Sequence, residues 1–435
     1  MSVFKIGASR QDTTPPIGTF LYGYRPDLAS KSVHDNLSVT AMAASDDVNT
    51  VLMLTAEIGD INNELCENIR NEISEKCSVP YENIMVSSTH THSAPNLSGV
   101  VGWGDIDGEY YTSIFLPAVI TASAKAIEDL QPAEIAVGVI KSEVGVNRRQ
   151  QFPDGNIGLG QNPHGCFDPN MTVASIRNSE TKEGILNLIH YGCHGTSAGL
   201  TDAITRDWSG IMIDRLEKET NTLSAFWNGA IGDVGPRLTN GETTGNISYT
   251  EELGGVAAMD AIKAYNSKGS YHKGNLEIFK DFVHLPRKKL PALDEVEAKL
   301  SAYNEPEKLI NIDRLEYEHY KAIKDYYLYN SVQTTDEFTY QQTIISLGDI
   351  IFIPFPFEMF SEIVMRLREY SPYPYTLCLS CTNGYNVYLP SQDQLCRGGY
   401  EVGCFMYGHI FPLADNTDHH IINENLRIIN ENKRG

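Results

Sequence analysis

Short apolar runs alternate with segments of helical periodicity along the chain, and this alternation predicts an α/β fold. Buried strands are predicted over residues 4–16, 51–60, 82–90, 133–147, 171–178, 184–194 and 223–233. A hairpin is predicted over residues 340–358, with its turn at Gly348-Asp349. Amphipathic helices are predicted over residues 61–77, 109–130, 207–220 and 359–370 and after residue 419. Asp60 lies directly before the first of these helices and is expected to cap it.

The segment from 288 to 330 differs from the rest of the chain. It is rich in Glu, Lys and Tyr, and its periodicity is typical of two helices that break at Pro306. We expect a helical hairpin that is inserted into the main fold or forms the surface of a homo-oligomer. No long linker divides the sequence, so a single domain over residues 1–435 is expected, with the helical insertion at 288–330 inside it.

The composition, with 41% hydrophobic and 21% charged residues, is that of a globular protein. A net charge of −22 makes nucleic acid an unlikely partner, because an acidic chain repels phosphates. No apolar run is long enough for a transmembrane segment, and no signal peptide is visible at the N-terminus, so a cytoplasmic location is expected. The eight cysteines are irregularly spaced, as reduced thiols are, and Cys378 and Cys381 form a CxxC within a strand-like segment.

Two histidines stand at the end of a predicted strand, in VSSTHTHSAP. Residues two apart on an extended chain point the same way, so His90 and His92 are expected to face one pocket together. The carboxyl ends of strands are where α/β proteins place their ligands. The pair is therefore half of a metal site, half of a catalytic dyad, or two hydrogen-bonded residues at a strand end.

A second predicted strand, ILNLIHYGCHG, also ends in histidine. His194 lies at its end, whereas His190 is placed mid-strand and is expected to be a core residue. Glu358 follows the apolar run DIIFIPFPF and is either a carboxylate ligand or an ordinary acidic residue in the first turn of a helix. Imidazoles and a carboxylate around an open position are what a hydrolytic zinc ion requires, so these residues favour a metal site.

Other residues support competing readings. The segment Gly-Thr-Ser-Ala-Gly at 195–199 matches the nucleophile-elbow pattern with Ser197 as its serine, but an elbow requires a helix directly after the serine. Tyr385, Tyr388 and Tyr400 lie in a loop-like region rich in Gly, Asn and Pro. They are either surface residues or groups that donate to an oxyanion or bind a metal.

Seven segments together resemble one family, the neutral (non-lysosomal) ceramidases and their bacterial homologues, over nearly the whole chain. The most specific is THTHSAP, which is similar to the family's THTHSGP. The others are IGASRQDTTPPIGTFLYGY, CHGTSAGL, TRDWSG, AIGDVGP, PFPFEMFSE and NGYNVYLPSQDQLCRGGYEVG. The resemblance implies a mixed β-sheet core flanked by helices, and a zinc-dependent hydrolase in which metal-activated water cleaves an amide bond.

The resemblance also implies a role for particular residues. The zinc ligands would be His90, His194, Glu358 and Tyr388. His92 and Tyr400 would stabilise the tetrahedral transition state, Arg148 and Gly23 would lie at the substrate, and Asp207 would hydrogen-bond a group that carries a ligand.

The sequence also departs from the family pattern. Gly235 in GDVGP replaces a serine that ceramidases carry, and the immunoglobulin-like domain and secretion signal of the family are not seen in the sequence. The expected substrate is therefore ceramide, another lipid amide or a smaller N-acyl amide. The competing hypotheses are a degenerate ceramidase fold that only binds a ligand, and a serine hydrolase that uses Ser197.

Overall fold

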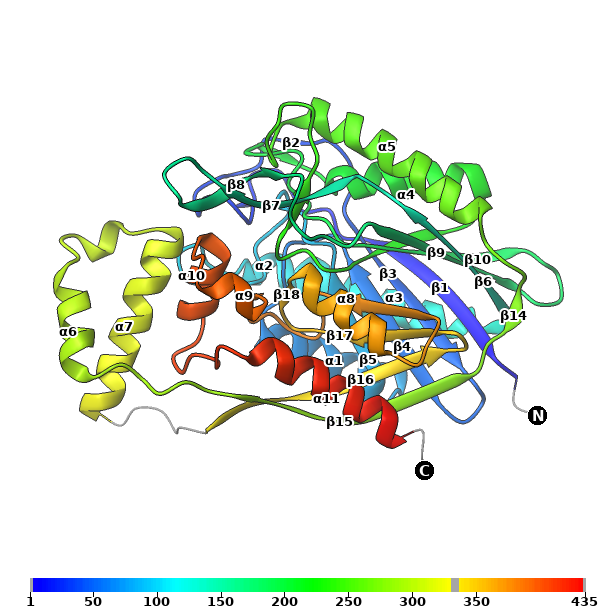
Figure 1. Cartoon of the computed structure of the whole chain (residues 1–435). Helices are drawn as coiled ribbons and strands as arrows, with labels where there is room; N and C mark the ends of the chain where they lie inside the picture. The colour runs from blue at the N-terminus through cyan, green and yellow to red at the C-terminus, as the bar shows by residue number, and fades with distance from the viewer. Residues whose placement is uncertain (1–2, 330–335, 433–435) are drawn as a thin grey trace.

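The chain folds into four layers, in which two β-sheets pack face to face between helices (Figure 1). The computed structural model describes residues 3–329 and 336–432. One face of a large sheet is covered by four helices, α1 (Asn63–Cys77), α3 (Leu116–Glu128), α4 (Asp207–Thr220) and α5 (Ile247–Asn266), and a four-stranded sheet covers the other. The outer face of the smaller sheet is covered by α8 (Ser361–Tyr370) and α11 (Thr417–Asn432). The expectation of a mixed sheet flanked by helices is confirmed.

The large sheet has nine strands, in the order β12-β10-β9-β6-β1-β3-β4-β5 with β14 beside β6. Only the pairs β10–β12 and β4–β5 are parallel. Its strands are β1 (Lys5–Asp12), β3 (Ser38–Ser45), β4 (Thr50–Ala56), β5 (Ile84–Ser88), β6 (Gln131–Lys141), β9 (Asn170–Asn178), β10 (Gly184–Tyr191), β12 (Ser224–Asn228) and β14 (His272–Lys273).

The smaller sheet has the order β15-β16-β17-β19 and contains the predicted hairpin. Its strands are β15 (Leu276–Pro286), β16 (Glu337–Leu347), β17 (Ile350–Pro354) and β19 (Tyr375–Leu379). Short ladders complete the β structure: β2 (Ser32–Val33) with β11 (Ala203–Ile204), β7 (Gly145–Gln151) with β8 (Ile157–Asn162) and β13 (Val234–Pro236), and β18 (Glu358–Met359) with β20 (Tyr388–Leu389).

The helices bury their apolar faces against these sheets, as their periodicity predicts. They are α1 (Asn63–Cys77), α2 (Gly108–Tyr110), α3 (Leu116–Glu128), α4 (Asp207–Thr220), α5 (Ile247–Asn266), α6 (Leu293–Ser301), α7 (Asn311–Tyr329), α8 (Ser361–Tyr370), α9 (Gln392–Leu395), α10 (Tyr400–Tyr407) and α11 (Thr417–Asn432). Among the described residues, no helix combines the length and apolarity needed to cross a membrane.

Three sequence predictions need correction. The cap of α1 is Asn62, whose side chain accepts from the backbone N–H of Leu65 at 2.8 Å, and not Asp60. Residues 133–147 form parts of two strands, β6 and β7, rather than one. Helix α5 was not predicted, because Gly254 and Gly255 interrupt its apolar pattern. Gly254 lies against α4 so closely that a Cβ there would come within 2.7 Å of the Ile211 side chain.

The large sheet is so strongly curled that its two edges meet. Strand β12 lies at one edge and β5 at the other, yet the two strands contact each other. Thr55 on β4 donates to the carbonyl of Phe226 at 2.6 Å, and Asn228 at the end of β12 donates to the carbonyl of Thr89 at 2.8 Å. The carboxyl ends of β5 and β10 are thereby brought together, although many strands separate them in the sheet order.

Segment 288–330 contains the two expected helices, α6 and α7, which pack against each other and project from one end of the molecule (Figure 1). A short 3₁₀ turn at Pro306–Lys308 lies between them, where the sequence predicted a break. Helix α7 contacts α10, and few of the hairpin's side chains are buried, namely Val296, Leu315, His319 and Ile323. The division into one domain with an insertion stays a prediction.

Candidate metal centre and active site

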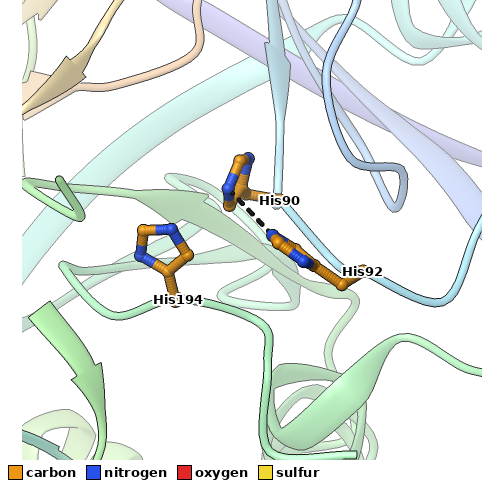
Figure 2. Close-up of side chains that lie close together, drawn as sticks. All are labelled: His90, His92 and His194. Atoms are coloured by element: carbon orange, nitrogen blue, oxygen red, sulfur yellow. Dashed lines mark hydrogen bonds between the residues drawn. The ribbon is translucent and has the colours of Figure 1, made fainter. Parts of the chain in front are cut away.

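Three imidazoles converge where β5 and β10 end (Figure 2). The ring nitrogens of His90, His92 and His194 that could bind a metal lie within 4.8 Å of one another. The two chain segments are joined directly, because Thr91 forms a parallel bridge with Gly195 and the His92 N–H donates to the Gly195 carbonyl at 3.1 Å. A side chain at Gly195 would come within 2.7 Å of the His90 carbonyl oxygen, so the close approach requires glycine.

The expectation that His90 and His92 lie on one extended strand is wrong in its geometry. Strand β5 ends at Ser88, and His90 has a left-handed backbone with φ of 63°. Its N–H donates to the Ile58 carbonyl at 2.9 Å, which holds this turn in place. The two rings nevertheless meet edge to face with their Nε2 atoms 3.2 Å apart, as the dashed line in Figure 2 shows.

A buried carboxylate completes the cluster. Glu358 Oε2 lies 3.0 Å from His194 Nε2 and 3.7 Å from His90 Nε2. Glu358 begins strand β18, and its backbone N–H donates to the Val387 carbonyl at 2.8 Å. Its other oxygen, Oε1, accepts from the Tyr385 hydroxyl at 2.6 Å, which leaves Oε2 directed at the imidazoles.

Two atoms of this cluster face each other without forming a hydrogen bond. His194 Nε2 and Glu358 Oε2 are fully buried, and neither has a hydrogen-bond partner within the described part of the chain. Buried polar atoms normally have partners, and a nitrogen and an oxygen that face each other without a hydrogen bond could both bind one cation. Two ligands of one tetrahedral zinc ion, each ~2.0–2.2 Å from it, lie roughly 3.3 Å apart, between the two separations found here. The donor set therefore fits zinc.

Two of the three histidines, His90 and His194, are held by a bond on the far nitrogen. His90 Nδ1 lies 3.1 Å from Asp60 Oδ1, and the other oxygen of Asp60 accepts from the Tyr22 hydroxyl at 2.9 Å. His194 Nδ1 lies 3.0 Å from the carbonyl oxygen of Val234, so it carries the proton. This arrangement leaves the Nε2 of each ring free to bind a metal, as outer hydrogen bonds do in zinc sites.

Burial favours the neutral form of two of the three imidazoles, one of which, His194, is a candidate ligand. Burial lowers the pKa of His194 well below its usual value, and the nearby Arg148 and His90 lower it further. Burial lowers the pKa of His92 in the same way. Burial also opposes the charged form of His90, but Asp60 and Glu358 outweigh it and raise the pKa of this ring. Neutral imidazole is the form that binds metals.

Tyrosine and arginine side chains form the opposite side of the cluster. Arg148 Nη2 donates to the Tyr388 hydroxyl at 2.9 Å, and the rings of Tyr388 and Tyr400 meet at 5.7 Å between centroids. Tyr388 pairs in register with Glu358 between β20 and β18. Arg148 Nε donates to Glu401 Oε1 at 2.9 Å, and this carboxylate is almost fully buried.

A small cavity opens beside the cluster. Its volume is about 20 Å³, space for a single water molecule. Its wall includes His90, His92, Glu358 and four tyrosines, and on the side facing α10 it is apolar, with Val100 and Trp103. A polar cluster beside an apolar wall suits a substrate that has one polar group and an apolar chain.

The N-terminal part of the chain matches a known family. Residues 4–252 match the model of the neutral/alkaline non-lysosomal ceramidase N-terminal domain. The chain belongs to this family. The resemblance seen in the sequence motifs is thereby confirmed, and family and fold together support an amide hydrolase.

Solved structures show the same fold over the whole chain. The crystal structure of neutral ceramidase from Pseudomonas aeruginosa matches with a TM-score of 0.74 at 16% identity, covering 99% of this chain and 75% of that one. A structure described as ceramidase complexed with C2 matches with a TM-score of 0.74 at 15% identity, covering 100% of this chain and 76% of that one. The likeness extends well beyond the residues that match the family model.

The remaining residues predicted from the sequence lie around the cluster. Gly23 has φ of 114° and touches the His92 ring, so closely that a Cβ there would lie 2.3 Å from His92 Nδ1. Asp207 accepts from the backbone N–H groups of Ser197 and Ala198 at 3.1 and 2.8 Å. It therefore fixes the loop that follows His194 rather than the imidazole ring.

The nucleophile-elbow interpretation of Ser197 does not agree with the structure. No helix begins after this serine until α4 starts at Asp207. The Ser197 hydroxyl is fully buried and donates to Asp207 Oδ1 at 2.5 Å, and it also contacts the Thr250 hydroxyl at 2.9 Å. His190 is a core residue, as expected, with Nε2 2.9 Å from the Cys378 carbonyl oxygen.

Gly235 lies behind Arg148 rather than in the cavity wall. It pairs with Val146 between β13 and β7, and a Cβ there would lie 2.8 Å from the Thr243 side chain and 3.4 Å from Arg148 Cβ. The Thr243 side chain thus occupies the space beside the position where ceramidases carry serine.

Several residues of the site were missed or misread from the sequence: Tyr22, Asp60, Trp103 and Glu401, and Tyr385 as the partner of Glu358. Asp60 carried a usable signal, because it ends an apolar run as Glu358 does. The contacts of the others depend on chain segments far apart in the sequence, which no local pattern reports.

Proposed function

We propose that the protein is a zinc-dependent amidohydrolase that cleaves a linear N-acyl amide of the ceramide type. The observation that carries this proposal is the convergence of His90, His194 and Glu358 with unpaired buried atoms directed at one point. These three residues would hold the ion. Tyr388 would be the fourth ligand, since its hydroxyl lies beside the cluster and accepts a hydrogen bond from Arg148.

A zinc ion bound here would supply a Lewis acid and a water whose pKa falls toward ~7. The remaining steps belong to the side chains. His92, kept neutral by burial, accepts a proton and returns it to the departing amine. Tyr400 donates its hydroxyl proton to the oxygen on which charge develops, and each such donor contributes ~3–4 kcal/mol to barrier lowering.

Arg148 holds the side of the site opposite the histidines. It is a permanently charged group, almost fully buried, and it contacts both Tyr388 and Glu401. Its field favours negative charge on the reacting carbonyl oxygen. Gly23 gives the His92 ring room, and Asp207 holds the backbone after His194.

The family supports a lipid amide as substrate, and the apolar side of the cavity at Val100 and Trp103 agrees with an acyl chain. The replacement of serine by Gly235 does not remove a residue of the cavity wall, since Gly235 is packed against Thr243. A ceramide-like N-acyl amide therefore remains the best-supported class.

The proposal is tested by metal analysis and hydrolysis together. Wild-type protein is expected to contain one zinc ion per chain and to lose hydrolysis of N-acyl amides when treated with a chelator. The double variant His90→Ala, Glu358→Ala should lack zinc and be inactive. Purified protein that hydrolyses amides without metal, or a double variant that retains full zinc, would contradict the proposal.

The role of His92 needs its own variant, because its ring nitrogens are as close to the cluster as those of the other histidines. His92→Ala should retain the metal and lose most of the hydrolysis. Loss of the metal in this variant would make His92 a ligand in place of Tyr388. The matched change Ser197→Ala should leave hydrolysis intact. In a serine hydrolase that used Ser197 as its nucleophile, the same change would abolish hydrolysis.

A further inference from the structure

The cavity beside the metal cluster is narrow in this structure. A volume of about 20 Å³, room for about one water molecule, is far too small for an acyl chain of many methylene groups. Part of its wall belongs to the buried core: His90, Glu358 and Tyr388 are each less than 5% exposed. Glu358 and Tyr388 are held by the paired strands β18 and β20, whereas a loop and α10 form the opposite side, so we infer that the substrate enters on the opposite side.

The opposite side is made by two segments that the α6–α7 hairpin backs. Val100 and Trp103 lie in the loop after the histidine motif, and Cys404 lies on α10. Ile312 at the start of α7 packs against α10, where a Cβ at Gly403 would lie 3.3 Å from it. The hairpin thus lies directly behind the apolar wall of the cavity.

Asn311 joins the start of α7 to the 100–103 loop, whereas His319 and Tyr320 further along α7 contact Tyr407 of α10. The backbone N–H of Asn311 donates to the Gly102 carbonyl at 3.0 Å, and its side-chain amide donates to the Tyr24 carbonyl at 3.3 Å. Tyr24 in turn packs on His92, with ring centroids 5.3 Å apart. Asn311 therefore links two loops. One is the 100–103 loop, which forms part of the cavity wall, and the other carries Tyr24, which packs on His92.

The backbone of Asn311 is strained, and one of its side-chain atoms lacks a hydrogen-bond partner among the described residues. Asn311 has φ of 51°, an uncommon conformation for a residue other than glycine. Its side-chain oxygen is buried and lacks a hydrogen-bond partner in the part of the chain that is described. Backbone strain of this kind persists at clamps and switch points. A contact with these features is weaker than the packing of the core.

Exposed apolar side chains flank this contact. Val101 is 44% exposed and Ile310 is 50% exposed, and each is the chain neighbour of one of the two bonded residues, Gly102 and Asn311. An acyl chain that entered here would meet apolar surface at once.

We propose that the α6–α7 hairpin, fastened through Asn311, sets the length of the acyl chain that reaches the metal cluster. This inference rests on the proposed amidohydrolase function. In the fastened state a long acyl chain is excluded, and it enters between the 100–103 loop and α7 when the Asn311 contacts open. The specificity determinants are therefore Asn311 and Gly102.

Two variants open the contact from opposite sides. Asn311→Gly removes the side-chain bond to Tyr24 while glycine tolerates the positive φ. Gly102→Ala places a methyl group 2.5 Å from the Asn311 carbonyl oxygen and forces the segments apart. The control is Lys321→Ala on α7, because the Lys321 side chain is 51% exposed and pairs only with Glu318 of the same helix among the described residues.

The experiment compares acetyl and dodecanoyl amides of one fluorogenic amine. Both opening variants should raise the ratio of kcat/KM for dodecanoyl over acetyl by about tenfold, with zinc content unchanged, and the control should match wild type. A ratio within twofold of wild type in both variants would refute the inference, as would an equal change for both substrates.

A binding measurement separates this inference from the proposed function. Dodecanoate, the acid that hydrolysis would release, should change Trp103 emission at about tenfold lower concentration in the opening variants than in wild type. If no amide is hydrolysed but dodecanoate binding shifts in this way, the amidohydrolase proposal fails and the access route stands. If amides are hydrolysed but neither the ratio nor the binding shifts, only the access route fails.

Discussion

Glu401 binds two buried arginines, and its replacement by glutamine should damage the active site without touching the proposed ligands. Its two oxygens accept from Arg148 Nε at 2.9 Å and from Arg149 Nη1 at 2.6 Å. All three residues are at most 5% exposed. Arg148 has only one other side-chain bond among the described residues, the one to Tyr388.

The magnitude follows from the burial. Removing one partner of a buried ion pair costs about 3–5 kcal/mol, because the remaining charge cannot be solvated. Arg149 retains the Gly398 carbonyl and the Gln394 side chain as acceptors, and glutamine keeps one acceptor oxygen, so the lower end of this range applies. We expect Glu401→Gln to lower the free energy of unfolding by about 3 kcal/mol.

The kinetic effect should exceed the effect on metal binding. Arg148 is fixed on one side by Glu401 alone, so its guanidinium shifts relative to Tyr388 and to the reacting carbonyl. A misplacement of about 1 Å costs on the order of 10²-fold in rate, and we expect kcat/KM to fall by about that factor with zinc retained.

The assay combines denaturant unfolding, metal analysis and amide hydrolysis. The matched control is Glu431→Gln, because Glu431 also pairs with an arginine, Arg427, but its side chain is 63% exposed. Such surface pairs contribute little, so the control should unfold and react like wild type. If Glu401→Gln behaves like its control in both measurements, the buried network does not position Arg148.

Two further predictions concern single side chains. Tyr385→Phe removes the 2.6 Å bond to Glu358 Oε1, and we expect zinc affinity to fall about tenfold in a competition titration with a chelator; affinity within twofold of wild type would exclude an orienting role. Burial raises the pKa of Glu57 to about 7, despite the opposing effect of Arg206. The unfolded chain loses this proton near pH ~4.3, so stability should fall by about 3 kcal/mol as pH rises from about 4.5 to 7. Glu57→Gln should flatten that part of the stability profile, and an unchanged slope would contradict the assignment.

The sequence was most informative where a single pattern determines an element. Helix α4 has the predicted bounds, 207–220, because its apolar periodicity is uninterrupted. Helix α5 was missed because its buried face uses small residues such as Gly254 and Ala257, which give a weak apolar signal. The small residues on this face of α5 are explained by its close packing against α4.

The site was predictable only in part. The histidine and glutamate positions could be inferred because each follows an apolar run, where strands present ligands. Their meeting could not be inferred, since it depends on the curl that joins the edges β12 and β5. The Asp60 contact to His90 was misread for the same reason: a strand-end acid before a helix looks like a cap until the fold shows that Asn62 takes that role.

The site draws on parts of the chain that the family model does and does not match. Residues 4–252 contain His90 and His194, whereas Glu358 and Tyr388 lie beyond them. Both parts share one apolar core, in which Leu188 of β10 and Phe352 of β17 belong to the same buried cluster. Any variant that loosens the packing between the two sheets would therefore separate the carboxylate from the imidazoles. Metal binding and sheet packing must then stabilise each other, because an ion bound by both parts favours only the state in which they are joined.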